Sequence, residues 1–444
     1  MNNYKKIPKK PTHKENQGVK MKRTISLFLS LILILGVLCS AISCTDVNVY
    51  VNGEGNTSGG GIQPDSSLGD DTGTLEGDLP TFIENGNQNT DYESLKPEAR
   101  ALLSTVRVLA HFERYLGYGQ TSLSKYKKES SGIIYRLDRA AGDAYVITNF
   151  HSVYHKDAIS SSHVSDNIEL FLYGQESAEY AIPATYVGGS LANEIAVLKV
   201  SASEVLKHSH ALPAVTTDSN DLRIFDEVFA MGNPEGLGLS VTNGIVSVEN
   251  DSLSILGADG KTTIKLRVIR TSAPINEGNS GGGLFTEDGK LCGIVVAKKT
   301  GDDIDNIAYA IPSNLASLIA DILIENYKGT VTVGFKKYQL GITMSTAASG
   351  IIVDEENSTL IKEELIKITA FAEGSALASF AELEDIITSI TVDGKTTRVT
   401  AMHNVIEAML EARLGSIVTV TLLRGEETIT KTLTVTESML LGVA

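Results

Sequence analysis

The chain has 444 residues, of which 42% are hydrophobic and 21% charged, an ordinary composition for a globular protein of two or three domains. Residues 1–44 hold eight of the 38 Lys and Arg residues but one of the 54 acids, so the remainder has 30 basic and 53 acidic residues, a net charge of −23. No basic cluster is left there to pair with phosphates, which argues against nucleic acid as a partner.

The first expected segment, residues 1–44, is an export signal. Its stretch MKRTISLFLSLILILGVLCSAISC has a basic start, an apolar run and small residues before Cys44. The end resembles a bacterial lipoprotein cleavage site with Cys44 as the lipidated residue, although Ala41 stands where Leu is usual. An uncleaved membrane anchor over residues 25–42 and a plain cleaved signal stay open as alternatives. Lipidation or an anchor would tether the folded part to a membrane, outside the cytoplasm.

A linker and two folded regions follow. Residues 45–97 are rich in Gly, Ser, Thr, Asn and Asp, which predicts a flexible acidic linker. Over residues 98–328, short apolar runs alternate with Gly, Asn and Asp, which predicts a β-barrel or sandwich closed by a helix with Ser313 as N-cap. Residues 333–440 mix strands with one helix that should end at Gly415. The expected fold is therefore mainly β.

The most informative stretch is INEGNSGGGLF, in which glycines crowd both sides of Ser280. Glycine permits backbone conformations that other residues resist, and a nucleophile needs such a loop if backbone N–H groups are to converge on an oxyanion. An ordinary Gly-rich turn is the alternative. His151 follows an apolar strand about 130 residues earlier. Between them, in the stretch NEIAVLKV, Glu194 lies one step before an apolar strand. Read alone, Glu194 could be an exposed strand-end charge or a buried acid with a role.

The order His, acid, Ser in these contexts resembles the trypsin-like serine proteases of the HtrA/Deg family. TNFHSV resembles the family's histidine strand, NEIAVLKV its acid motif, and FAMGNPEGLGLSVTNGIVS its Gly-Asn-Pro loop with the following hairpin. INEGNSGGGLF resembles the serine motif and IAYAIPSN the closing strand. The resemblance implies a chymotrypsin-like double β-barrel over residues 98–328, followed by an α+β PDZ domain over residues 333–440.

The resemblance also implies a role for each matched residue. Ser280 would be the nucleophile and His151 the general base, while Glu194 would orient the imidazole and stabilise its charged form. The loop of Gly278, Asn279 and Ser280 would form the oxyanion hole. Peptide-bond hydrolysis through an acyl-enzyme needs no metal or cofactor.

The acid departs from the family, in which this position is normally Asp. Aligning Asn193 instead would shift the strand by one residue and turn the wrong faces inward. Glu194 keeps the charge but is longer by ~1.5 Å, and a misplacement of about 1 Å can cost ~100-fold in rate. We expect a working acid, with Asp at position 194 equal or faster and Gln or Ala much slower. An imperfect substitute stays open.

Substrate preference is partly readable through the resemblance. The residue six positions before the nucleophile lies at the base of the primary pocket in this fold, and here it is Pro274 rather than an acid. Another wall should come from Val295, Val296 and Ala297. Cleavage is therefore expected after small or medium aliphatic residues, not after Arg or Lys.

The C-terminal region has a site of its own. YQLGI, with Gln339, Leu340, Gly341 and Ile342, resembles the PDZ loop whose backbone N–H groups capture a peptide's C-terminal carboxylate, after which the peptide adds as a strand. A plain strand beside a core helix is the alternative.

The function implied is that of a membrane-tethered serine endopeptidase in the cell envelope, which cleaves unfolded or damaged exported proteins. Expected partners are those substrates, peptide C-termini and a membrane, and the family implies a homotrimer. A catalytically weak or inactive scaffold that binds peptides or unfolded chains remains the alternative. A protease that cuts a single signalling partner would share the same chemistry.

Overall fold

The computed structural model describes residues 90–115, 123–233, 238–298, 307–329, 332–333, 335–355 and 359–443, all within one unit of the chain, Gly77–Ala444. The predicted export segment, the lipidation of Cys44 and most of the predicted linker lie outside these residues. None of the helices in the described ranges combines the length and the hydropathy of a membrane span.

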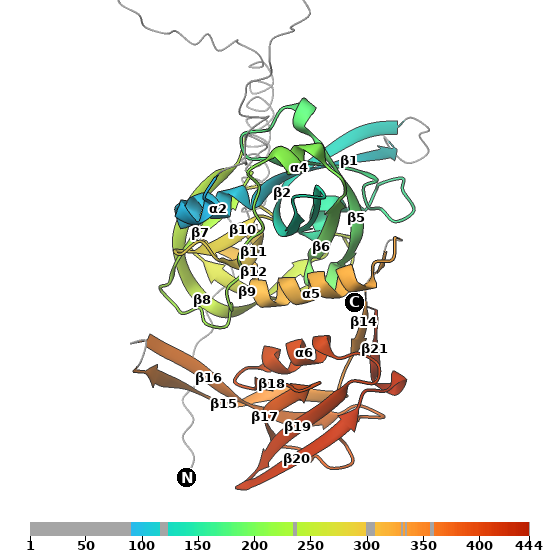
Figure 1. Cartoon of the computed structure of the whole chain (residues 1–444). Helices are drawn as coiled ribbons and strands as arrows, with labels where there is room; N and C mark the ends of the chain where they lie inside the picture. Colours follow the sequence, from blue (N-terminus) through green and yellow to red (C-terminus); the bar gives the residue numbers. More distant parts are fainter. Residues whose placement is uncertain are drawn as a thin grey trace, which may run out of the picture. The chain divides into compact units, whose positions relative to one another are not determined.

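Six antiparallel strands form the first β-barrel (Figure 1). They are β1 (Thr105–Tyr115), β2 (Leu123–Asp138), β3 (Asp143–Thr148), β4 (Asn167–Leu172), β5 (Ile182–Ser190) and β6 (Ile195–Val200). They pair in the order β5-β4-β1-β2-β3-β6, and pairing between β5 and β6 closes the ring. The short strand β13 (Thr332–Val333) adds to β5 in parallel. Helices α2 (Pro97–Leu103), α3 (Phe150–Val153) and α4 (Glu204–His208) complete this part of the chain.

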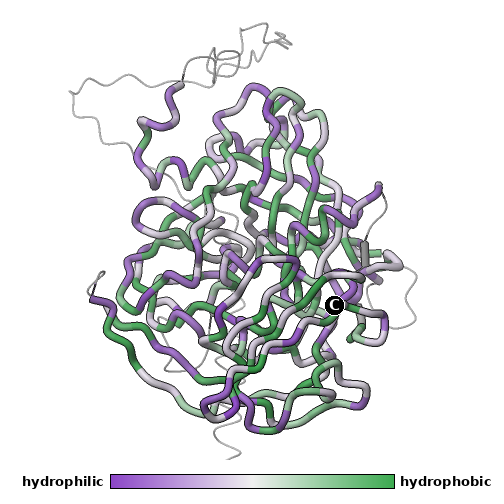
Figure 2. Tube along the Cα trace, turned by 60° about the horizontal axis from the view of Figure 1, so that its bottom comes forward, coloured by the Kyte–Doolittle hydropathy of each residue, from purple (hydrophilic) through white to green (hydrophobic). Residues whose placement is uncertain are grey.

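Six further strands form the second barrel, which is also closed. They are β7 (Glu227–Gly232), β8 (Ser240–Leu256), β9 (Thr263–Thr271), β10 (Gly283–Thr286), β11 (Leu291–Lys298) and β12 (Ala308–Pro312). Figure 2 shows hydrophobic and hydrophilic stretches alternating along the chain trace. The two closed rings confirm the expected chymotrypsin-like double β-barrel.

Strand β6 is buried on both faces, which explains its unbroken apolar sequence. Ile195 and Val197 belong to a core cluster that includes helix α5 (Ser313–Asn326), while Ala196 belongs to the core of the first barrel. A strand covered on both sides has no reason to alternate apolar and polar residues. Glu194, one step before this strand, therefore stands where two cores meet.

The C-terminal region forms an α+β unit. Its strands are β14 (Lys336–Tyr338), β15 (Ile342–Asp354), β16 (Thr359–Phe371), β17 (Ile386–Val392), β18 (Lys395–Arg398), β19 (Ile417–Arg424), β20 (Glu427–Thr434) and β21 (Leu440–Val443). The main sheet has the order β15-β16-β17-β19-β20, so β15 is an edge strand, and β14 pairs with β21. Helix α6 (Met402–Glu411) buries Val405, Ala408 and Met409 in the core of this unit. The expected α+β composition is confirmed.

Both predicted helices form, but their ends differ from the sequence prediction. Pro312 is the N-cap of α5, and Ser313 is the first helical residue, with its hydroxyl donating to Thr217 O at 3.0 Å. Helix α6 ends at Glu411 rather than near Gly415. Gly415 lies in the following turn with φ +89°, and its N–H donates to Val435 O at 2.9 Å. Both errors arose because these residues bond to distant segments rather than to their own helix.

Candidate active site

The histidine and the acid are brought together by the pairing of β3 with β6. Thr148 lies opposite Ala196 in this antiparallel pair, so the residues that follow β3 face those that precede β6. His151 lies in α3, the short helix after β3. Its Nδ1 is 2.8 Å from Glu194 Oε2, and its backbone N–H donates to the same oxygen at 3.3 Å. The predicted His–acid pair is therefore present in the structure.

Glu194 is a buried acid, so the alternative of an exposed strand-end charge is wrong. Its side chain is 2% exposed. It follows a 3-10 turn, η4 (Leu191–Asn193), and has a left-handed backbone with φ 56° and ψ 32°. That conformation costs an L-residue about 1–2 kcal/mol. Its carbonyl accepts hydrogen bonds from Asn149 Nδ2 at 3.0 Å and Phe150 N at 3.3 Å, which hold the residue in place.

Ser280 lies in the loop between β9 and β10, which is anchored to both barrels. Its carbonyl accepts from Ser131 N at 2.9 Å, and Gly281 N donates to Val295 O at 2.8 Å. A Cβ built on Gly281 would lie 3.2 Å from Asn149 N, which places this loop against the segment that leads into His151. The Ser280 hydroxyl donates to Val296 O at 3.4 Å. Within the described part of the chain, no hydrogen bond joins it to His151.

Two backbone N–H groups are available for an oxyanion. Gly278 has φ +94°, and neither its N–H nor that of Ser280 makes a hydrogen bond to any described residue. The N–H of Asn279 is different, because it donates to Asn276 O at 3.2 Å. Of the three residues predicted to form the oxyanion hole, Gly278 and Ser280 therefore have donors to offer, and the Asn279 N–H is already used within the turn.

Ser131 on β2 holds this loop, and sequence reasoning missed it. Its hydroxyl donates to Gly278 O at 2.7 Å and accepts from Asn233 N at 2.8 Å, while its carbonyl accepts from Thr148 Oγ1 at 2.7 Å. The residue is fully buried. The bond to Gly278 O holds the Gly278 peptide in place. The pair of serines before Gly132 was the available signal, but the two partners of the Ser131 hydroxyl, Gly278 and Asn233, are over 100 residues away.

The glycines after Ser280 are required by close packing. A Cβ at Gly282 would lie 2.1 Å from Met231 O, a backbone atom on β7 that cannot move aside. We expect Gly282→Ala to lower the free energy of unfolding by about 3 kcal/mol, measured by chemical denaturation. Gly350→Ala is the control, because a Cβ there meets nothing within 4 Å. Equal stability of the two variants would contradict the packing described for this loop.

The residues predicted to form the specificity pocket are dispersed between surface and core. Pro274 is exposed, and its carbonyl accepts from Thr242 Oγ1 at 2.8 Å. Val295 is fully buried in the second barrel, and Val296 is 3% exposed, with its carbonyl at the Ser280 hydroxyl. Ala297 lies in β11, but its side chain is outside the described part. The preference for aliphatic residues stays a prediction.

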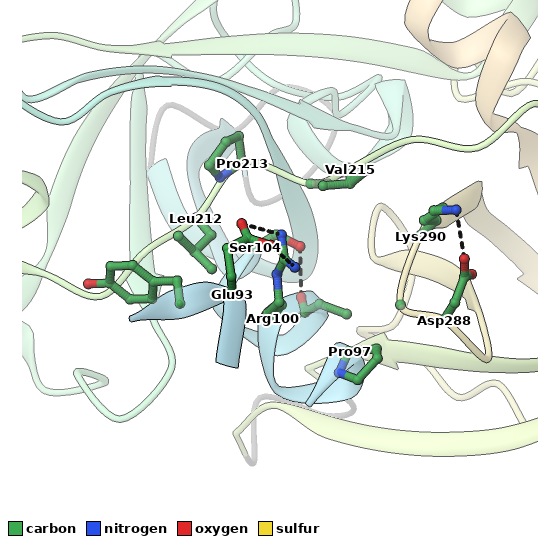
Figure 3. A pocket seen from close by; sticks show the side chains of 13 residues that line it. Glu93, Pro97, Arg100, Ser104, Leu212, Pro213, Val215, Asp288 and Lys290 are labelled. Atoms are coloured by element: carbon green, nitrogen blue, oxygen red, sulfur yellow. Dashed lines mark hydrogen bonds and ion pairs between the residues drawn. The ribbon is translucent and has the colours of Figure 1, made fainter. Parts of the chain in front are cut away.

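A separate pocket of about 270 Å³ is lined by residues near α2 and by the turn between β10 and β11 (Figure 3). Its charged side chains pair with each other, Arg100 with Glu93 and Lys290 with Asp288. None of the three predicted catalytic residues lines it. We assign it no part in the chemistry.

The loop before β15 combines a left-handed glycine with two unpaired N–H groups among the described residues. Gly341 has φ +71°, and a Cβ there would lie 2.8 Å from Ser375 Cα. The N–H groups of Leu340 and Gly341 have no partner among the described residues, whereas Gln339 N donates to Met439 O at 2.9 Å. Ile342 then opens the edge strand β15. The Leu340 side chain is buried in the core of the unit.

Comparisons with known proteins agree with this geometry. A family model described as a trypsin-like peptidase domain matches residues 130–294, which contain all three predicted catalytic residues. Serine protease Do-like HtrA of Bacillus subtilis (strain 168) is 34% identical over 297 residues, 62% of this chain and 60% of that protein. Serine protease Do-like HtrA of Lactobacillus helveticus is 30% identical over 307 residues, 67% of this chain and 65% of that protein.

A solved structure titled HtrA-type protease AlgW with decapeptide has a TM-score of 0.48 and 21% identity, over 79% of this chain and 99% of that one. The chain spans less than two thirds of the length of the two curated relatives. The peptidase model and both relatives nevertheless indicate the same kind of protein, a serine protease. The chain has a trypsin-like peptidase domain over residues 130–294 and is similar to serine proteases of the HtrA group.

Proposed function

We propose that the protein is a serine endopeptidase with Ser280 as nucleophile, His151 as general base and Glu194 as the orienting acid. The observation that carries the proposal is the bond between His151 Nδ1 and the buried Glu194 carboxylate at 2.8 Å. A carboxylate at Nδ1 keeps the proton there and leaves Nε2 as the base. The Ser280 loop, packed against the same segment, offers two free N–H groups to a developing oxyanion.

The reaction follows from these positions. The Ser280 hydroxyl leaves the Val296 carbonyl, transfers its proton to His151 Nε2 and attacks the scissile carbonyl carbon. The N–H groups of Gly278 and Ser280 bind the resulting oxyanion, while Glu194 stabilises the imidazolium. His151 then gives the proton to the leaving amine, which produces the acyl-enzyme. Water activated by His151 releases the second product and restores Ser280.

The physiological setting is part of the same proposal. The substrates are unfolded or damaged exported proteins, and the location is the cell envelope, outside the cytoplasm. Residues 98–328 form the protease domain, and residues 333–440 form a PDZ domain that binds peptide C-termini. Residues 1–44 supply a lipid anchor at Cys44 or a membrane anchor, residues 45–97 supply the linker, and the assembly is a homotrimer. The location is supported by a relative from Brucella suis biovar 1 (strain 1330), which carries the name "Probable periplasmic serine endoprotease DegP-like".

The catalytic proposal is tested with the full-length protein, a denatured protein substrate and a serine-directed fluorophosphonate. We expect cleavage of the substrate, together with a covalent label that mass spectrometry places on Ser280. The alternative, an inactive scaffold, predicts binding of the denatured protein with neither cleavage nor label. A label on another serine would contradict the site.

The PDZ proposal has its own test, which does not depend on catalysis. A peptide with a free C-terminal carboxylate should bind at least about tenfold more tightly than the same peptide with a C-terminal amide, because charge-assisted hydrogen bonds to Leu340 and Gly341 N–H are lost. Calorimetry with Ser280→Ala protein prevents cleavage of the peptide during the measurement. Equal affinities would show that these N–H groups do not capture a carboxylate.

A further inference from the structure

A lysine is directed into the candidate active site from the first barrel. Lys128 lies on β2 opposite Ala110 of β1, and its Nζ donates a hydrogen bond to the backbone carbonyl of His151. None of the ion pairs among the described residues includes it. Burial lowers the pKa of Lys128, and the nearby Glu194 carboxylate acts against that shift. The ammonium group is therefore partly removed from water and lies within the field of the candidate triad.

The charges of His151 and Glu194 show why a positive charge on Lys128 matters. With His151 neutral, the buried Glu194 carboxylate carries a full negative charge, and its two hydrogen-bond donors both belong to the uncharged His151. An isolated buried carboxylate is costly, and a nearby positive charge reduces that cost. The same positive charge opposes a second cation, so it disfavours uptake of a solvent proton by His151.

Several charged groups other than Lys128 and Glu194 lie near α3. The elements that pack against α3 are β1, β2 and β6. His155, just after α3, has a pKa lowered mainly by burial, with Asp157 acting against this shift and Lys128, Arg114 and Lys156 adding to it. Burial raises the pKa of Tyr154, just after the helix, and Asp259 and Asp157 add to this shift. Apart from Glu194, no described carboxylate pairs with His151.

We propose that Lys128 is a positioning residue for the reaction: it fixes the backbone of His151 through the carbonyl bond, and its charge offsets Glu194 and keeps His151 in the neutral, proton-accepting form. The proposal rests on the proposed function, since it takes the Ser280, His151 and Glu194 triad as the catalytic machinery. It assigns to β2 a part in catalysis in addition to its structural part in the barrel.

The test is the pH profile of kcat/KM on a fluorogenic peptide, from about pH 5 to 9. Lys128→Met removes the charge near the pair, so His151 takes up a solvent proton more readily. We expect the acid limb of the profile to move to higher pH by about half a unit or more. Lys128→Gln, which keeps a donor without the charge, should move the limb similarly. Lys128→Arg keeps both the positive charge and a hydrogen-bond donor, so its acid limb should lie at the same pH as that of the parent protein.

The controls separate a charge effect from damage to the fold. Lys127→Met removes an exposed lysine from the next position on β2 and should leave the limb unmoved. The Lys128→Met measurement is repeated with His155→Gln, so that titration of His155 cannot produce the shift. An acid limb that moves in neither Lys128→Met nor Lys128→Gln would overturn the proposal, because the charge of Lys128 would then have no effect on His151. Absence of a fluorophosphonate label on Ser280 in the parent protein would instead overturn the catalytic function.

Discussion

Replacing Ser280 with Ala should lower kcat for peptide hydrolysis by about 10⁶-fold and abolish fluorophosphonate labelling. The hydroxyl is the only group in the proposed mechanism that forms the acyl-enzyme bond, and no other part of the triad can substitute for it. Stability should change little, because the described structure gives this hydroxyl one long hydrogen bond, 3.4 Å to Val296 O. The measurement is kcat on a fluorogenic peptide, together with thermal unfolding.

A matched control is available on the second barrel. Ser252 is exposed on β8, and Ser252→Ala should keep full activity and full labelling. Cleavage that survives in Ser280→Ala, after a contaminating protease has been excluded by inhibitor, would contradict the site. Loss of activity together with loss of the folded state would leave the labelling of the parent protein as the deciding measurement, because it needs no variant.

The contact between His151 and Glu194 is predicted well from the sequence because local patterns determine the position of each residue. An apolar strand ending in Thr-Asn before His151, and an unbroken apolar strand after Glu194, place each residue at the end of a strand. Once β3 and β6 pair, the two side chains meet. The Gly-rich loop of Ser280 is equally local. What these motifs share is that each residue's position is determined by the few residues on either side of it.

Features that depend on distant contacts could not be predicted in this way. The bond from Ser131 to Gly278 O spans 147 positions. Lys128 donates to a carbonyl 23 positions away, and nothing in the sequence distinguishes it from the neighbouring lysines. The left-handed backbone of Glu194 leaves no mark on a sequence, because glycine or asparagine is the usual signal for it. The helix ends at Ser313 and Gly415 were wrong for the same reason.

Replacing Glu194 with Gln should lower kcat/KM by about 10⁴-fold. The two Glu194 Oε2 contacts, 2.8 Å to His151 Nδ1 and 3.3 Å to His151 N, both require an acceptor. A Gln side chain that presents its NH₂ group to Nδ1 favours the tautomer with the proton on Nε2, which cannot accept the Ser280 proton. Glu194→Ala should be comparably slow. A rate near that of the parent in either variant would show that Glu194 is not the working acid.

The Asp variant tests how the longer acid is accommodated. The sequence alone favours Asp at position 194 as equal or faster, but the structure argues for the reverse. The 2.8 Å bond to His151 is made by a full-length Glu from a left-handed backbone that is tied to Asn149 and Phe150. From that backbone, Asp would fall short by up to ~1.5 Å, and a displacement of about 1 Å costs ~100-fold. We therefore expect Glu194→Asp to lie between the parent and Glu194→Gln in kcat/KM, and an Asp variant as fast as the parent would mean that the loop over residues 191–194 adjusts freely.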